Sequence, residues 1–297
     1  MIRFIRKALA ALAALPLVAS CSAAEVAVSE AKPALWKVAD ADTTIYLFGT
    51  IHVLPKDYQW RTRPFEAALA TADSLVLEIV VDGAEAQDPK TMQALATSPG
   101  LPPLLDRVPA AERPALSDLV ASSKIPMASL DRMETWAASL ALASNMVADL
   151  NLSPNNGVER QLTATFRAAN KPISGLETVT QQLGYFDTLP EATQRAFLSS
   201  VVNSNKDASA EFTQMIAAWA SGDTQRIAAT FDDEMKASPE LADVLLTKRN
   251  ANWASWVKQR LATPGTVMVA VGAGHLVGAD SVQAMLAKDG LKVTRVQ

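Results

Sequence analysis

The 297-residue chain contains few of the residues that carry redox and nucleophilic chemistry. It has one cysteine, Cys21, and two histidines, His52 and His275, and only 6% of its residues are aromatic. With one cysteine the chain cannot form an internal disulfide, so it must fold without one. No basic stripe is visible and the formal net charge is -4. Both features argue against nucleic acid as a partner.

Several catalytic signatures are absent as well. The His-Glu-x-x-His motif of standard zincins and the Gly-x-Ser-x-Gly motif of serine hydrolases do not occur. No phosphate-binding loop follows a strand, and Gly272-Ala273-Gly274 has only two of the required glycines. The sole cysteine, Cys21, falls in the N-terminal segment that predicts an export signal. The sequence therefore excludes the standard zincins and gives hydrolases with a serine or cysteine nucleophile no support.

Residues 1–21 predict a lipoprotein signal peptide. A basic start precedes an apolar segment over residues 8–18, which is too short to span a bilayer comfortably. Val18-Ala19-Ser20-Cys21 resembles a lipobox. We therefore expect an exported cell-envelope protein, lipid-anchored at Cys21 in the outer membrane and facing the periplasm, with a tether over residues 22–32. The alternative is an ordinary signal peptide, which would leave a periplasmic protein.

The two histidines end similar apolar segments. Residues 45–52 and 267–275 are both rich in β-branched and apolar side chains, and each closes on Gly-x-x-His. Apolar runs that stop at glycine predict strands. Because ligands of open α/β sheets bind beyond the carboxyl ends of strands, we predict that His52 and His275 share one site. The alternative is that each is an ordinary hydrogen-bonded loop residue.

A carboxylate follows a third apolar segment. Glu78 lies within residues 74–81, where burying a carboxylate without a partner would be costly. If this strand lies beside the strand that carries His52, Glu78 reaches the same pocket as a metal ligand or general base. A structural salt bridge is the alternative explanation.

The order of the segments predicts an α/β fold with a mixed β-sheet core and flanking helices. A hairpin and a β-α-β unit open the chain, up to residue 81, and a β-α-β unit over residues 266–296 closes it. The residues between read mostly as helix, which is more helix than the connections of one small sheet need. We therefore predict one α/β domain over residues 33–297 with a large inserted helical lobe over about 83–260.

Three places in the helical region concentrate polar chemistry. Glu159, followed by Arg160, falls in the first turn of a helix, where the helix dipole favours a carboxylate. Glu177 ends a short strand and precedes another helix; ordinary helix-start chemistry also explains both glutamates. Arg249 shares a helix face with two tryptophans. It is either a solvated residue beside core aromatics or, with the amide of Asn250, directed into the pocket.

Two histidines and one or more glutamates match the ligand set of a divalent metal such as Mn, Co, Zn or Fe. We expect His52, Glu78 and His275 to hold such an ion. Glu177 or Glu159 would then serve as base or further ligand. An ion with an open position acidifies water, which is the usual route to hydrolysis at neutral pH.

Together these segments resemble the TraB/PrgY/GumN family, which includes the Tiki proteases and is related to the ChaN and erythromycin-esterase groups. The resemblance runs from about Trp36 to Val296. Besides the two Gly-x-x-His motifs and the Glu78 strand, it rests on Gly157-Val158-Glu159-Arg160, Leu176-Glu177-Thr178 with Gln181, and Arg249-Asn250 with Trp253. It implies a mixed-sheet α/β core and a site at His52, Glu78 and His275, with Glu159, Arg160, Glu177, Arg249 and Asn250 at secondary positions.

The resemblance leaves more than one activity open. Tiki-like members imply metal-dependent peptide cleavage with Mn or Co favoured, and erythromycin-esterase relatives imply a metal-free histidine base. ChaN-like relatives imply haem binding, and PrgY-like members act on or sequester peptide pheromones. We expect an exported metal-dependent hydrolase, peptidase-like, acting on a peptide or small-molecule substrate. The alternatives are a non-catalytic envelope protein that binds haem, metal or peptide, and a metal-free histidine-dependent hydrolase of the esterase type.

Overall fold

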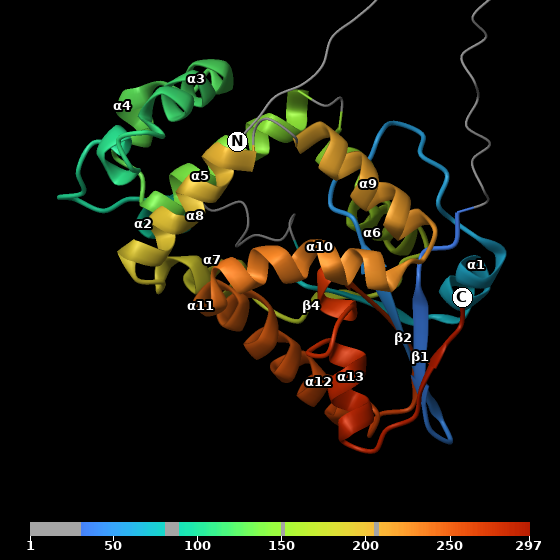
Figure 1. Ribbon diagram of the computed structural model, residues 1–297. Helices are drawn as coiled ribbons and strands as arrows, with labels where there is room; N and C mark the ends of the chain where they lie inside the picture. Colours follow the sequence, from blue (N-terminus) through green and yellow to red (C-terminus); the bar gives the residue numbers. More distant parts are fainter. Residues whose placement is uncertain (1–30, 81–88, 150–151, 205–207) are drawn as a thin grey trace, which may run out of the picture.

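The computed structural model describes residues 31–80, 89–149, 152–204 and 208–297 (Figure 1). The expected signal peptide and nearly all of the expected tether lie outside these ranges. No helix of the described residues is long and apolar enough to cross a membrane. Six strands form one mixed sheet in the order β4-β3-β5-β2-β1-β6, which confirms the predicted α/β fold. They are β1 (Leu35–Ala39), β2 (Thr43–Thr50), β3 (Ser74–Leu77), β4 (Ile173–Gly175), β5 (Gly265–Gly272) and β6 (Val293–Arg295).

The pairing of the strands decides which residues meet at the sheet edge. β1 pairs antiparallel with β2, as the hairpin predicted, and with β6. β2, β5, β3 and β4 are mutually parallel. Four parallel strands therefore end at the same edge. β5 lies between β2 and β3, so Glu78 follows a strand that borders the strand of His275. The direct neighbourhood with the strand of His52, which the sequence left as a condition, is not present.

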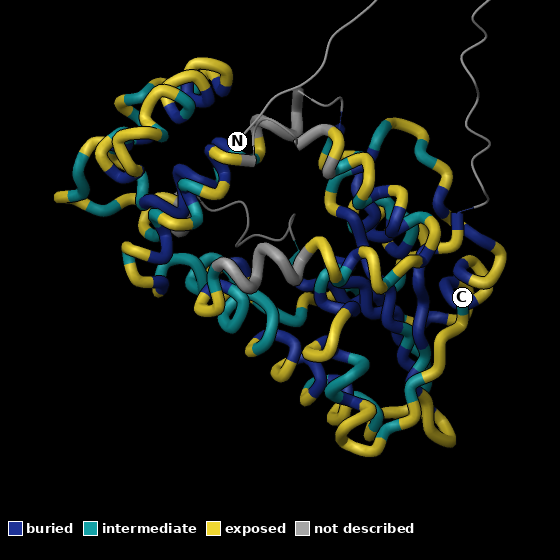
Figure 2. The backbone as a smooth tube through the Cα atoms, viewed as in Figure 1, coloured by how far each residue is buried: buried dark blue, intermediate teal, exposed yellow. Residues whose placement is uncertain are grey.

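Helices cover both faces of the sheet because the strands are apolar on both sides. One face packs against α1 (Arg63–Thr71), α6 (Val158–Ala168), α9 (Ala208–Ala220) and α10 (Thr224–Ala237), around an aromatic cluster of Phe48, Trp60, Phe65 and Trp219. The other face packs against α12 (Lys248–Arg260) and α13 (Val282–Lys288). Along β5, Met268 and Ala270 face the first layer and Val267, Val269 and Val271 the second, the alternation expected of a strand. Figure 2 shows the sheet as the buried centre of this part.

A second group of helices has its own core. α3 (Arg113–Ser123), α4 (Met127–Leu130), α5 (Thr135–Asp149) and α8 (Glu191–Ser204) pack around leucines that include Leu116, Leu130, Leu142 and Leu198. We call these helices, together with α2 (Pro89–Ala96), the distal lobe; α3 and α4 lie at its far end from the sheet (Figure 1). The helical lobe predicted over about 83–260 is thus divided between the distal lobe and the sheet part. β4 belongs to the sheet, and α6, α9, α10 and α12 pack against it.

One helix connects the distal lobe to the sheet edge. α7 (Val179–Asp187) starts just after Glu177, and its last turn reaches the lobe, where the ring of Phe186 stacks on Trp136 with centroids 5.9 Å apart. On the other side of the site, α11 (Pro239–Ala242) and a π-helical turn (Asp243–Thr247) lead directly into α12. Both connections therefore begin or end at residues of the candidate site.

Candidate active site

Side chains that follow the parallel strands converge at the carboxyl edge of the sheet. His52 comes two residues after β2, His275 three residues after β5, and Glu78 directly after β3. A Cβ placed on Gly272 would lie 3.1 Å from Glu78 Oε1, 3.5 Å from His52 Nε2 and 3.7 Å from His275 Cδ2. We call the small volume that these three groups border the Gly272 space. The structure thus brings both Gly-x-x-His motifs and Glu78 to one place.

His52 is the accessible member of this group. Its side chain is 67% exposed, and its Nδ1 lies 2.6 Å from Glu159 Oε1, which also accepts a hydrogen bond from the Thr50 hydroxyl. Because an ionised carboxylate can only accept, Nδ1 carries the proton and Nε2 is directed to the Gly272 space. The carboxylate of Glu159 raises the pKa of His52 to about 9. Water around the exposed ring weakens this attraction.

The start of α6 holds the His52 loop in place. The backbone N–H of Val158 donates to the carbonyl of Ile51 at 3.1 Å, and a Cβ on Gly157 would lie only 2.0 Å from the carbonyl oxygen of His52. Glycine at position 157 is therefore required for this close approach. Glu159 follows in the first helical turn, where the helix dipole stabilises its negative charge beside the histidine.

A buried arginine ties the remaining polar residues together. Arg249 is 6% exposed, and its Nη2 lies 2.6 Å from Glu78 Oε2 while its Nε lies 2.9 Å from Glu177 Oε1. Nη1 lies 3.1 Å from His275 Nε2. Both oxygens of Glu177 accept from Arg249, and Oε1 also accepts from Trp253 Nε1 at 3.0 Å. Glu177 therefore anchors Arg249, and this geometry gives no support to its expected role as a base.

Glu78 is ionised although it is buried. Its Oε1 accepts the backbone N–H of Gly272 at 2.7 Å, and its Oε2 accepts from Gln182 at 3.0 Å as well as from Arg249. Burial acts to raise the pKa of Glu78, but His275, Arg249 and His52 outweigh this effect and lower it to about 2. The carboxylate thus presents a fixed negative oxygen to the Gly272 space.

His275 differs from His52 in burial and in charge. Its Nδ1 lies 2.6 Å from Asn250 Oδ1, and the amide of Asn250 is oriented because its nitrogen donates to the carbonyl of Asp280 at 2.8 Å. Nδ1 therefore carries the proton, and Nε2 accepts from Arg249. Burial lowers the pKa of His275 to about 4. The ring is neutral at neutral pH and packs on Trp253 with centroids 4.3 Å apart.

Five of the eight candidate residues, Glu78, Glu177, Arg249, Asn250 and His275, join one hydrogen-bonded network. His52 and Glu159 form a separate pair on the other side of the Gly272 space. Arg160 lies exposed on α6 beside Glu159. Sequence reasoning missed the contacts of Thr50 and Gln182. Gln181, which the family resemblance indicated, completes a capping box with Thr178. The residue that reaches Glu78 is its neighbour, Gln182. The capping box could have shown from the sequence that Gln182 lies in the first turn of a helix. The direction of the Gln182 side chain depends on how α7 packs, which the sequence does not show.

The predicted metal ligands do not fit an ion in this arrangement. Within the described ranges, no group of three or more His, Cys, Asp and Glu residues is placed to hold a metal ion. Among the predicted ligands His52, Glu78 and His275, the obstacle is Arg249. Its guanidinium donates to Glu78 Oε2 and His275 Nε2, and so occupies the lone pairs that an ion would need. The potential ligand atoms that border the Gly272 space are His52 Nε2 and Glu78 Oε1.

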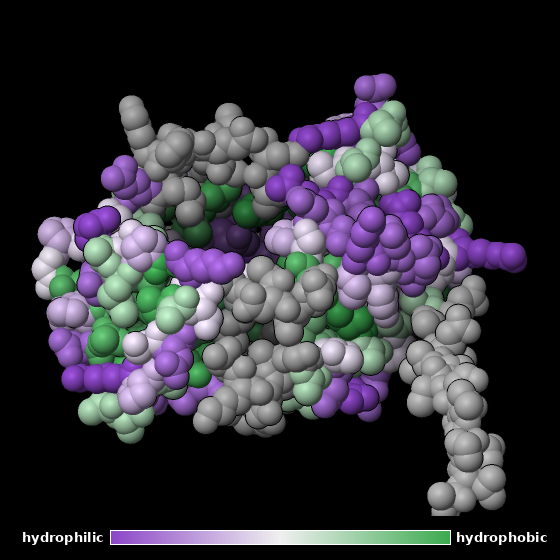
Figure 3. Space-filling model, turned by 90° about the horizontal axis from the view of Figure 1, so that it is seen from above, coloured by the Kyte–Doolittle hydropathy of each residue, from purple (hydrophilic) through white to green (hydrophobic). Residues whose placement is uncertain are grey.

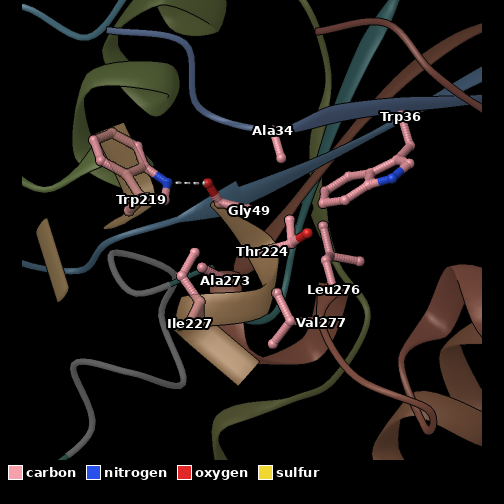
Figure 4. A pocket seen from close by; sticks show the side chains of 9 residues that line it. All are labelled: Ala34, Trp36, Gly49, Trp219, Thr224, Ile227, Ala273, Leu276 and Val277. Carbon is pink, nitrogen blue, oxygen red and sulfur yellow. Dashed lines mark hydrogen bonds between the residues drawn. The ribbon is translucent and has the colours of Figure 1, made fainter. Parts of the chain in front are cut away.

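The two motif glycines have different structural roles. A Cβ on Gly49 would lie 3.1 Å from the Cα of Ala273, so this glycine lets two backbone segments approach closely. Figure 4 shows the small pocket beside them, where Trp219 Nε1 donates to the carbonyl of Gly49 at 2.8 Å. The described residues that line the pocket include none of the eight site candidates. Gly272 instead opens the space that borders the polar groups.

Fold and site define an α/β protein that carries a histidine–carboxylate centre at the carboxyl edge of a mixed sheet. The chain belongs to the TraB/PrgY/gumN family, whose family model matches residues 34–295. It is similar to the protein YbaP of Escherichia coli K12, with 25% identity over 241 residues, which cover 81% of this chain and 87% of the relative. YbaP of Shigella flexneri shows the same identity and coverage. No solved structure matches.

Proposed function

We propose that this chain is an exported hydrolase, lipid-anchored at Cys21, that cleaves amide or ester bonds in peptide or small-molecule substrates. The observation that carries the proposal is the His52–Glu159 pair, in which Nε2 of His52 borders the Gly272 space opposite Glu78 Oε1. Residues 1–21 support export and anchoring. Figure 3 shows a hollow between the distal lobe and the sheet part, with hydrophilic side chains at its floor, which supports access for a substrate.

The pair can perform general base and then general acid catalysis. A water molecule in the Gly272 space can donate one proton to His52 Nε2 and direct the other to Glu78 Oε1 while its oxygen attacks the substrate carbonyl. The imidazolium that forms is stabilised by Glu159 and then returns the proton to the leaving amine or alkoxide. Because Glu159 raises the pKa of His52, the basic form of the ring becomes abundant under alkaline conditions, and hydrolysis should become faster as the pH rises.

The metal-dependent peptidase expected from the sequence is the second candidate. One observation favours it: Glu78, Glu159 and Glu177 bring three negative charges against the single guanidinium of Arg249. The negative field that favours a proton on His52 also favours a divalent cation beside its Nε2. This candidate requires that Arg249 release His275, because the guanidinium holds the lone pair of that histidine.

The proposal is tested by screening the full-length chain against peptide and ester libraries, with a chelator and with Mn, Co, Zn or Fe added. We expect hydrolysis that His52→Ala abolishes and that the chelator leaves intact. Lys56→Ala, an exposed change in the same loop, is the matched control and should keep full activity. Loss with the chelator and recovery with one ion would support the metal-dependent candidate. Equal activity in His52→Ala would refute both, and no turnover by any form would support a binding protein.

A further inference from the structure

Arg249 lies at a position with the surroundings of a metal centre. Two carboxylates and one imidazole surround it: its nitrogens lie 2.6 Å from Glu78, 2.9 Å from Glu177 and 3.1 Å from His275. We propose that Arg249 takes the place of an ion in this cluster, so that the site holds a tethered cation and binds no divalent metal through His275. This inference rests on the geometry of the cluster and does not depend on hydrolytic activity.

The hydrogen bonds show that the cluster is built for a guanidinium. Arginine has five N–H donors in a planar fork, and each has an acceptor here. Nε donates to Glu177, Nη2 to Glu78 and Glu177, and Nη1 to His275 and to the carbonyl of Leu245 at 3.2 Å. Leu245 belongs to the π-helical turn before α12, and such turns occur at functional sites. A tetrahedral ion such as Zn²⁺ has four ligand positions, fewer than the five acceptor atoms that bond Arg249.

The apolar surroundings also suit an arginine. The guanidinium carbon lies 4.7 Å from the ring centre of Trp253 and 5.7 Å from that of Tyr185. Aromatic faces attract a weakly hydrated, planar cation such as guanidinium, whereas Mn²⁺, Co²⁺ or Zn²⁺ prefer nitrogen and oxygen ligands. The cluster therefore offers a flat cation both its polar edge and its aromatic faces.

The tethered cation gives the two histidines different tasks. The hydrogen-bonding capacity of His275 is fully used by Asn250 and Arg249 inside the protein. His275 is thus a positioning residue that fixes Arg249, and Arg249 in turn holds the carboxylate of Glu78 with Oε1 at the Gly272 space. Of the two histidines, His52 is the one that a substrate can reach.

The proposal is tested by titrating the full-length chain with Co²⁺ and following the visible d–d absorption. The wild-type chain should show no tightly bound Co²⁺ that depends on His275, so wild type and His275→Ala should give the same curve. Arg249→Met/Glu177→Gln removes the cation and one of the two negative charges that it balances, and leaves Glu78 and His275 as ligands. This variant should bind Co²⁺ roughly tenfold or more tightly than wild type, and adding His275→Ala should remove the gain.

Two results would overturn the proposal. One is a wild-type chain that binds about one Co²⁺ with an affinity that His275→Ala abolishes. The other is a folded Arg249→Met/Glu177→Gln chain, by circular dichroism, with no gain in Co²⁺ affinity. If that variant does not fold, the comparison of wild type with His275→Ala still decides between the proposal and its opposite. Failure of the hydrolase proposal would appear in the substrate screen and would not alter this titration.

Discussion

Adding a single methyl group at Gly272 should separate catalysis from stability. The backbone at Gly272 has φ −49° and ψ 136°, a conformation that alanine adopts without strain. Gly272→Ala therefore leaves the chain path unchanged and places a Cβ in the Gly272 space. That atom would lie 3.1 Å from Glu78 Oε1 and 3.5 Å from His52 Nε2, where the attacking water has to sit.

The distances set the expected size of the effect. Glu78 is held by Arg249 and by the Gly272 N–H, so it can yield only by a few tenths of an ångström, and the water must move by more. A displacement on the order of 1 Å costs about 100-fold in rate. The stability should change by only about 1 kcal/mol, since the tight contact and the smaller entropy of the unfolded alanine chain act in opposite directions.

Gly49→Ala is the matched control, because the same substitution in the other motif meets backbone instead of the polar groups. Its Cβ would lie 3.1 Å from the Cα and 3.3 Å from the Cβ of Ala273, so it should destabilise the fold by about 1–3 kcal/mol. The folded fraction should keep its kcat. Measuring kcat, KM and thermal unfolding for both variants tests the reasoning. A Gly272→Ala enzyme with unchanged kcat would refute it.

Glu159→Gln removes the charge that raises the pKa of His52, so the pH–rate profile should move to lower pH; an unmoved profile would contradict the pairing. Burial lowers the folded pKa of His275 to about 4, against about 6.5 when unfolded. Between these values only the unfolded chain takes up the proton, so stability should fall as the pH drops from about 6.5 to about 4, by on the order of 3 kcal/mol. His275→Asn should remove this fall, as shown by the free energy of unfolding measured by denaturation at each pH. Gly157→Ala meets the carbonyl of His52 at 2.0 Å and should destabilise the protein strongly in thermal unfolding, whereas Gly184→Ala, with nothing within 4 Å, should not.

Much of the fold is encoded locally and was predictable. The region between β3 and β5 is mostly helical, as predicted, and the opening hairpin is present. The position of β5 was not predictable, because it inserts between β2 and β3 from about 190 residues further along the chain. That choice depends on how both faces of the sheet are covered, and no local pattern carries this information.

The site shows the same division between local and long-range information. The rule that ligands bind at the carboxyl edge was enough to bring His52, Glu78 and His275 together. It could not show that the two similar motifs differ in exposure, since α12 supplies the Arg249, Asn250 and Trp253 that cover His275. The interpretation of Arg249 as a solvated residue is wrong, because it is buried with two carboxylates.

The most direct test of the central claim is an NMR pH titration of the imidazole nitrogens in the full-length chain. The chain has only two histidines, so His52→Ala assigns both sets of signals. We predict that His275 stays neutral with its proton on Nδ1 from about pH 5 upwards, and that His52 stays doubly protonated at neutral pH and loses a proton only well above the ordinary value of about 6.5. If both histidines titrate near the ordinary value of about 6.5, the pairing of His52 with Glu159 and the burial of His275 against Arg249 are contradicted.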